Sequence, residues 1–320
     1  MKPLFIFGPG KSGTTLVGAL LDGHPEVVTL PVETHVVSRL ALPATRDGFD
    51  DALSAFVRAR YERLAERGYL DMEYAAFRDA IDRRLGDDRD ALSVLRALVM
   101  AYGEGKGWLG ENTRYWGDNT PSYAKTFEPL LEAAGQEDSD FRVLHILRDP
   151  RDNWYSWRRY RDKKKPHRKW DLPWFLRRWY RSAHLAGRHL DRFGPERYRI
   201  MRYEDLVEEP EAETRRIADF LGITWRDSML IPTRGGSPWG GNSMHGKTFQ
   251  GISNSSVGRW KDALDENERA EIERCLGPEM RAHDYPPVDP SRSARVFRWR
   301  ETASLWRQRR AIRSVLTALG

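Results

Sequence analysis

Cysteine is almost missing from this sequence, in which Cys275 is the only one among 320 residues. A lone cysteine can form no disulfide within the chain and provides no cysteine-based metal site. The eight histidines do not fall at the close spacings of metal ligands, so we expect no metal. Long hydrophobic runs are missing as well, because the apolar stretch after Met1 soon meets Gly8. That stretch is too short for a signal peptide or a membrane span, and the sequence predicts a cytoplasmic location.

The sequence does contain enough apolar material for a core and an excess of positive charge. Hydrophobic residues make up 40% of the chain and aromatic residues 11%. A length of 320 residues suits one large domain or two small ones. The net charge of +6 favours an anionic partner, for which nucleic acid, a nucleotide and an acidic lipid surface are candidates.

Segments typical of strands alternate with helical segments along the chain. We expect strands at residues 5–7, 141–147 and 197–203, and helices at residues 14–22, 48–102, 150 onward, 172–193 and 210–221. This alternation predicts an α/β fold with a mostly parallel central sheet that helices cover on both faces. We assign residues 1–290 to this domain. Residues 291–320, with eight arginines and one glutamate, are assigned to a basic helical tail.

A glycine-rich turn, GPGKSGTT at residues 8–15, lies between the first strand and the first helix. Such a turn lets backbone amides and a helix N-terminus face a phosphate group. Gly8 and Gly13 have the spacing of the P-loop of nucleotide-binding proteins, but Thr14 and Thr15 follow them, where an ATPase would have lysine and then serine or threonine. The lysine lies inside the turn at Lys11, so the ATP-type motif is not matched.

The stretch KSGTT, followed by LLDGHPEV, resembles the 5′-phosphosulfate-binding loop of sulfotransferases that use the activated sulfate donor PAPS. The resemblance implies a P-loop-like fold and a donor site formed by Lys11, Ser12, Gly13, Thr14 and Thr15. In the family, the basic side chain at the position of Lys11 contacts the sulfuryl group and the bridging oxygen. A phosphate loop of another kind, or a simple turn, is the alternative interpretation.

A second motif, LRDPRDNWYS at residues 147–156, follows the second strand. Arg148 comes directly after that strand, and Ser156 lies eight residues later on the helix that Pro150 begins. The guanidinium and the hydroxyl could therefore meet at one phosphate, whose oxygens match the fork of an arginine. The pattern is similar to the 3′-phosphate motif of the same family. The alternative is an arginine in a salt bridge and a serine on the helix surface.

Two later segments also resemble this family. Residues 201–223 are similar to its third-strand segment, which places Tyr203 near the nucleotide. The stretch SSVGRW at residues 255–260 resembles a late loop that closes over the donor, and Arg259 matches its basic position.

The stretch PVETH at residues 31–35 carries the candidates for a general base. The region resembles tyrosylprotein sulfotransferases, whose catalytic glutamate stands just before the threonine, and this implies Glu33 as the base. His35 is the alternative, because imidazole titrates near neutrality. Glu33 could also be a plain acidic residue at a helix N-terminus. Nearby, Asn119 stands where many family members have a lysine, so a side chain on the acceptor side is missing.

These motifs together predict an enzyme that moves a sulfuryl group from PAPS to a hydroxyl or amine acceptor and leaves PAP. The acceptor could be a small molecule, a carbohydrate or a peptide. One alternative is a nucleotide-dependent kinase with a divergent phosphate loop. Another is a basic module that binds nucleic acid or lipid through residues 158–181, which contain eleven Lys or Arg. The tail could contact a membrane surface or form a homo-oligomer.

Overall fold

A computed structural model of the chain describes residues 1–36, 46–88, 90–135, 139–164, 166–167, 171–241 and 251–288. The basic tail at 291–320 lies outside these ranges, so its helical character and its membrane or oligomer contacts stay predictions. The division of the chain at residue 290 also stays a prediction. None of the helices within the described ranges combines the length and the apolar character that crossing a bilayer requires.

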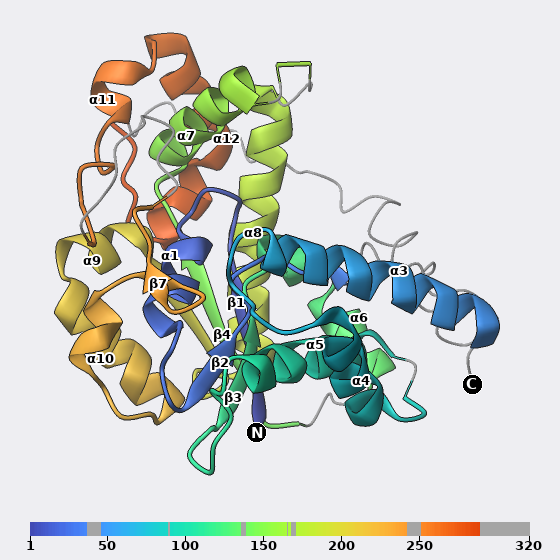
Figure 1. Ribbon diagram of the computed structural model, residues 1–320. Helices are drawn as coiled ribbons and strands as arrows, with labels where there is room; N and C mark the ends of the chain where they lie inside the picture. Colours follow the sequence, from blue (N-terminus) through green and yellow to red (C-terminus); the bar gives the residue numbers. More distant parts are fainter. Residues whose placement is uncertain are drawn as a thin grey trace.

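The centre of the molecule is a parallel sheet of five strands in the order β2-β3-β1-β4-β5 (Figure 1). Every pair of neighbouring strands runs parallel. The strands are β1 (Lys2–Phe7), β2 (Val27–Thr29), β3 (Tyr115–Asp118), β4 (Arg142–Leu147) and β5 (Tyr198–Arg202). The α/β class predicted from the sequence is therefore confirmed.

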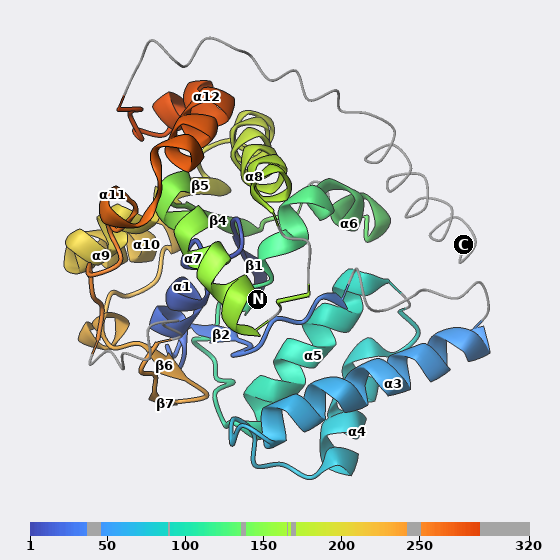
Figure 2. The same cartoon turned by 90° about the horizontal axis from the view of Figure 1, so that it is seen from above.

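Helices cover both faces of the sheet because its central strands are apolar on both sides. In β1, Leu4 and Ile6 belong to one buried cluster, and Phe5 and Phe7 belong to another. A run of this kind is typical of a strand buried between two helical layers. Viewed from above, one group of helices lies on each side of the sheet (Figure 2).

The cluster with Leu4 and Ile6 is covered by α1 (Thr14–Leu21), α9 (Tyr203–Glu208) and α10 (Pro210–Leu221). The opposite face is covered by α3 (Arg46–Ala65), α4 (Tyr74–Leu85), α5 (Ala91–Gly105), α6 (Phe127–Ala133) and part of α8 (Leu172–Phe193). A third cluster joins α7 (Pro150–Lys164), α8 and α12 (Glu266–Ala282). Short elements complete the chain: η1 (Pro121–Lys125), η2 (Asp227–Leu230), β6 (Thr233–Arg234), β7 (Ser237–Pro238) and α11 (Trp260–Ala263).

Two of the expected helices have the expected bounds, because local signals fix their ends. Asp171 caps α8 by accepting a hydrogen bond from the Trp174 amide at 2.9 Å. Helix α10 begins at Pro210 and ends at Leu221, where Gly222 caps it with a φ of 64°. The helical region expected at 48–102 is divided into α3, α4 and α5.

The sheet order brings the candidate site segments to one edge. In a parallel sheet, all carboxyl ends lie at the same edge, and ligands bind beside them. The glycine-rich turn follows β1, and Arg148 follows the adjacent β4. The segment with Glu33 follows β2, Asn119 follows β3 and Tyr203 follows β5. All five strands therefore contribute to one candidate site.

Candidate active site

The turn after β1 closes tightly and leads directly into α1. Lys11 has a φ of 67°, and Gly13 has a φ of 112° just before the first helical residue. A Cβ atom at Gly13 would lie 2.6 Å from the Tyr203 ring, and one at Gly10 would lie 2.5 Å from the Trp157 ring. Both positions require glycine because aromatic rings press against the backbone.

One face of α7 holds this turn in place. Trp157 Nε1 and Asn153 Nδ2 donate hydrogen bonds to the Gly10 carbonyl oxygen at 2.7 and 3.0 Å. The Lys11 ammonium lies over the Tyr160 ring, 4.6 Å from its centroid. Residues three or four apart share one face of a helix, so Ser156 lies on the same stripe as Asn153 and Tyr160. The predicted hydroxyl therefore lies on the helix face that meets the turn.

Arg148 connects three of the segments that the sequence singled out. Its Nη1 donates to the Lys11 carbonyl oxygen at 3.2 Å, and its Nη2 donates to the Ser256 carbonyl oxygen at 2.7 Å. Its guanidinium carbon lies 4.5 Å from the centroid of the Tyr203 ring. The turn, the late loop and the start of α9 therefore meet at one arginine, which is only 7% exposed.

Buried polar atoms without a hydrogen-bond partner gather at this point of the fold. Within the part of the chain that the structure describes, they include Ser12 Oγ, Asn153 Oδ1 and Arg148 Nε. Each such atom costs on the order of 1–3 kcal/mol unless a ligand or water pairs with it. The serine hydroxyl and the guanidinium can both donate to an anion. These two donors therefore fit an anionic group such as a phosphate, whereas the Asn153 amide oxygen can only accept a hydrogen bond.

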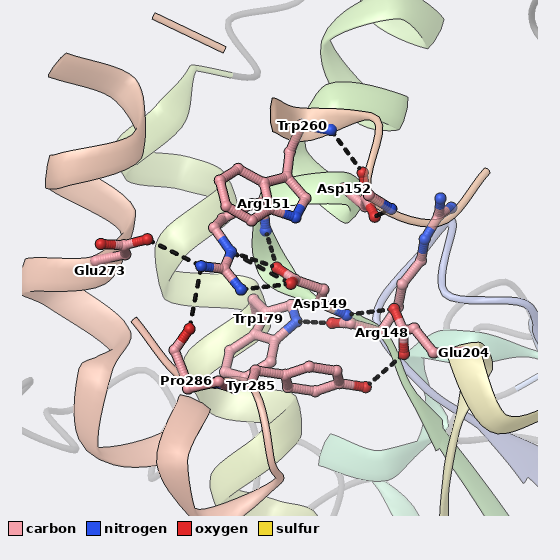
Figure 3. A network of polar contacts seen from close by, with 11 residues as sticks. Arg148, Asp149, Arg151, Asp152, Trp179, Glu204, Trp260, Glu273, Tyr285 and Pro286 are labelled. Atoms are coloured by element: carbon pink, nitrogen blue, oxygen red, sulfur yellow. Dashed lines mark hydrogen bonds and ion pairs between the residues drawn. The ribbon is translucent and has the colours of Figure 1, made fainter. Parts of the chain in front are cut away.

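Buried carboxylates fix the backbone beside Arg148 (Figure 3). Glu204 accepts a hydrogen bond from the Asp149 amide at 3.0 Å and another from the Tyr285 hydroxyl at 2.9 Å. Trp179 Nε1 donates to the Arg148 carbonyl oxygen at 3.0 Å. Burial raises the pKa of Glu204, against the opposing effect of its backbone hydrogen bonds. This network holds the backbone of Arg148 and Asp149 and so positions the Arg148 side chain. No sequence pattern identified the residues of the network.

Asp152 ties the late loop to α7 in the same view (Figure 3). Its carboxylate accepts hydrogen bonds from the amides of Gly258 and Trp260 at 2.7 and 2.9 Å. Arg151 stacks 4.0 Å from the Trp260 ring and forms ion pairs with other buried carboxylates. Arg259, the predicted donor contact in this loop, donates to the Ser255 carbonyl oxygen instead. The structure thus brings the loop to the site, while a donor contact of Arg259 stays a prediction.

The two candidate bases are partners of each other. His35 Nε2 lies 2.8 Å from Glu33 Oε2, and the side chains are 26% and 42% exposed. The amides of Thr34 and His35 both donate to Thr120 Oγ1, at 3.0 and 3.3 Å. The Thr120 amide donates in turn to Asp118 Oδ2 at 3.0 Å, and burial raises the pKa of Asp118 to about 6. Asp118 and Thr120 thus position the pair, and the sequence analysis missed both.

Lys11 and Glu33 interact electrostatically across the site. Burial lowers the pKa of Lys11, the Glu33 carboxylate opposes that change, and Arg148 lowers the pKa further. Arg234 of β6 is a second cation attracted by Glu33, and it donates to the Pro31 carbonyl oxygen. Arg234 was missed because it lies in a glycine-rich segment about 200 residues away in the sequence.

Asn119 is turned toward α1. Its side chain is 4% exposed, and a Cβ atom at Gly18 would lie 2.8 Å from its Nδ2. A lysine there would have to displace this close packing against the helix. The departure from the family pattern is thus accommodated by a glycine that lets α1 approach.

A parallel sheet with a glycine-rich turn between its central strand and the following helix defines a fold of the P-loop type. Residues 3–227 match the model of the Sulfotransferase family, and the chain belongs to that family. Among solved structures, the fold is similar to a sulfotransferase domain from the curacin biosynthetic pathway. The TM-score is 0.51 at 21% identity, and the match covers 85% of this chain and 96% of that domain.

Curated relatives have two kinds of name. Protein-tyrosine sulfotransferase 2 of Gallus gallus is 27% identical over 233 residues, which are 72% of this chain and 53% of the relative. Carbohydrate sulfotransferase 7 of Mus musculus is 28% identical over 109 residues, which are 33% of this chain and 22% of the relative. The chain therefore spans about half the length, or less, of the curated relatives that it matches.

Proposed function

We propose that this chain transfers the sulfuryl group of PAPS to a hydroxyl or amine acceptor and releases PAP. The main support is the convergence of two buried donors, Ser12 Oγ and Arg148 Nε, which lack partners in the described part of the chain. They lie in and beside the turn that resembles the family's phosphosulfate loop. The acceptor class is a small molecule, a carbohydrate or a peptide, and the names of the relatives include the last two. A cytoplasmic location stays a prediction from the sequence.

Donor binding would divide between the two motifs. The backbone of residues 11–15 and the N-terminus of α1 would hold the 5′-phosphosulfate, because both present N–H donors and positive potential. Arg148 and Ser156 would hold the 3′-phosphate. Tyr203 would lie beside the nucleotide, and Arg259 would contribute charge from the loop that Asp152 anchors.

The reaction would be an in-line displacement at sulfur. The acceptor oxygen or nitrogen forms a bond to sulfur as the bond from sulfur to the bridging phosphate oxygen breaks. Glu33, paired with His35, would take the acceptor proton. Lys11 would stabilise the charge that develops on the leaving phosphate oxygen. The attraction between Lys11 and Glu33 supports this arrangement, because the two groups must flank the transferred sulfuryl group.

The alternative functions are less well supported. A kinase would need the lysine after the last glycine of the turn, whereas Lys11 precedes Gly13. A non-enzymatic module that binds nucleic acid or lipid would not explain why hydrogen-bond donors at Ser12 and Arg148 are buried without a partner in the described part of the chain.

PAP should raise the melting temperature of the protein, and ATP should raise it far less. A ligand at 100 times its Kd stabilises the folded state by about 2.7 kcal/mol. Thermal-shift measurements at matched nucleotide concentrations provide the test. Equal shifts from both nucleotides would favour the kinase alternative.

Replacing Arg148 with alanine should weaken PAP binding more than it changes the chemical step. The lost charge-assisted contacts should cost about 1.5–3 kcal/mol, which is roughly 10–100-fold in Kd. Calorimetric titration with PAP measures this change. Arg96→Ala, at an exposed position on α5, is the matched control. An unchanged Kd for Arg148→Ala would remove Arg148 from the 3′-phosphate site.

A further inference from the structure

A buried carboxylate lies close to the arginine of the proposed 3′-phosphate site. Asp152 is in the first turn of α7, four residues after Arg148, and it is 0% exposed. Burial raises the pKa of Asp152, against the opposing effects of the Arg148 charge and of hydrogen bonds from two backbone amides. A negative charge beside an anion site repels the ligand that the site must bind. The charge of Asp152 therefore does not by itself explain its position.

Both oxygen atoms of Asp152 hold the late loop, residues 255–260 (Figure 3). Oδ2 accepts a hydrogen bond from the Gly258 amide at 2.7 Å, and Oδ1 accepts one from the Trp260 amide at 2.9 Å. An ionised carboxylate has two acceptor oxygens and no donor, so it can pair with both amides at once. An acid that only complements a helix dipole would require neither burial nor partners 106 and 108 residues away in the sequence.

The late loop in turn holds the Arg148 side chain. Arg148 Nη2 donates to the carbonyl oxygen of Ser256, two residues before Gly258, at 2.7 Å. Arg148 Nη1 donates to the Lys11 carbonyl oxygen at 3.2 Å. The guanidinium is therefore fixed between the late loop and the glycine-rich turn. A displaced loop would remove one of the two contacts that orient it.

We propose that Asp152 is a positioning residue for the donor, because it holds the late loop that orients Arg148 toward the 3′-phosphate. Asp152 acts through the loop and the Ser256 carbonyl group, without touching the nucleotide. This inference rests on the proposed function and adds to it a residue that sets the affinity for PAP and PAPS.

Neutralising Asp152 separates positioning from a direct effect of its charge. Asp152→Asn keeps the size of the side chain but retains only one of the two acceptor oxygens. If Asp152 acted on the donor only through its charge, this change would strengthen PAP binding. We expect the opposite, a rise of roughly 10-fold in the calorimetric Kd for PAP. In the slow hydrolysis of PAPS, KM should rise by a similar factor, while kcat should change less than about twofold.

Two further variants show whether the effect belongs to this contact. Asp162→Asn is the matched control on the same helix, because the Asp162 side chain is 56% exposed, and it should leave the Kd for PAP unchanged. The double variant Arg148→Ala/Asp152→Asn tests the route through Arg148. Once Arg148 is absent, Asp152→Asn should have little further effect on PAP binding. Fully additive losses would overturn the route through Arg148.

Gly258 allows a test from the side of the loop, which holds even if Asp152→Asn does not fold. Its φ of 71° lies in a region that β-branched residues disfavour and asparagine tolerates. The nearest atom that the described chain brings to a Cβ at this position is Lys261 Cε, at 3.9 Å. Gly258→Val should therefore strain the loop and weaken PAP binding severalfold, and Gly258→Asn should weaken it less. An unchanged Kd for Gly258→Val would contradict the role of the loop.

Hydrogen exchange of the Gly258 and Trp260 amides measures the hold on the loop without any ligand. These amides should exchange slowly in the unaltered chain and faster in Asp152→Asn, by about 10-fold or more for at least one of them. Unchanged exchange, or a Kd for PAP that stays the same or falls, would overturn the inference. Failure of the unaltered chain to bind PAP would instead count against the proposed function, while the exchange rates would still test the hold of Asp152 on the loop.

Discussion

Glu33→Gln should leave PAP binding nearly unchanged and lower turnover by about 10²–10⁴-fold, the usual effect of losing a general base. Glutamine keeps the shape of the side chain and can still accept the hydrogen bond from His35, but it cannot take a proton. The 2.8 Å contact between Glu33 and His35 makes this a selective test, because geometry is retained while basicity is lost. Turnover with an acceptor, beside a calorimetric Kd for PAP, measures the two effects separately.

His35→Gln is the companion variant and should be milder. In the proposed mechanism His35 orients Glu33 and shares its proton, so its loss should reduce turnover without abolishing it. The reverse order of effects would assign the base role to His35. A variant of Glu33 that loses PAP binding would place this carboxylate in the donor site instead.

The parallel sheet was predictable because its central strands are apolar on both faces. Residues 141–147 and the start of the chain show this pattern, and helix ends such as Asp171 and Gly222 have local signals. Strands β2 and β3 were missed because they have only three and four residues, too few to show a recognisable pattern of apolar residues. Helix α12 was missed as well, and Pro278 within it weakens the local helix signal.

The meeting of the glycine-rich turn and Arg148 was also predictable, because both follow strand ends in the sequence. Arg148 comes directly after β4 and Lys11 lies in the turn after β1, so a parallel sheet brings them together. The contacts that orient them come from distant segments. Glu204 of α9 accepts a hydrogen bond from the amide of Asp149, the residue after Arg148, and Tyr285, which follows α12, donates to Glu204; both contacts depend on tertiary packing. The sequence left Glu33 and His35 as alternative bases and did not predict that they contact each other. The backbone turn that brings them together, with a φ of 55° at His35, has no sequence signal.

Lys11→Met should reduce turnover by about 10²–10³-fold, comparable to the loss of one group that stabilises developing charge. Methionine retains much of the length of the lysine side chain, and it meets the same backbone strain at a φ of 67°. Lys11→Arg retains the charge and is the matched control, with a smaller loss. The slow hydrolysis of PAPS to PAP provides an assay that requires no acceptor.

The same assay separates Lys11 from Glu33. A group that stabilises the leaving phosphate must act whatever the nucleophile is, so Lys11→Met should impair hydrolysis and acceptor transfer alike. A base fitted to the acceptor hydroxyl need not act on water, so Glu33→Gln should impair transfer more than hydrolysis.

Lys11 must also be protonated to act, and burial lowers its pKa from 10.5. The kcat/KM for PAPS should therefore fall as pH rises through a value below 10.5, because this ratio reports the free enzyme. The alkaline fall should be absent from Lys11→Arg, whose guanidinium stays charged. Hydrolysis that is insensitive to Lys11→Met would remove this lysine from the leaving-group role.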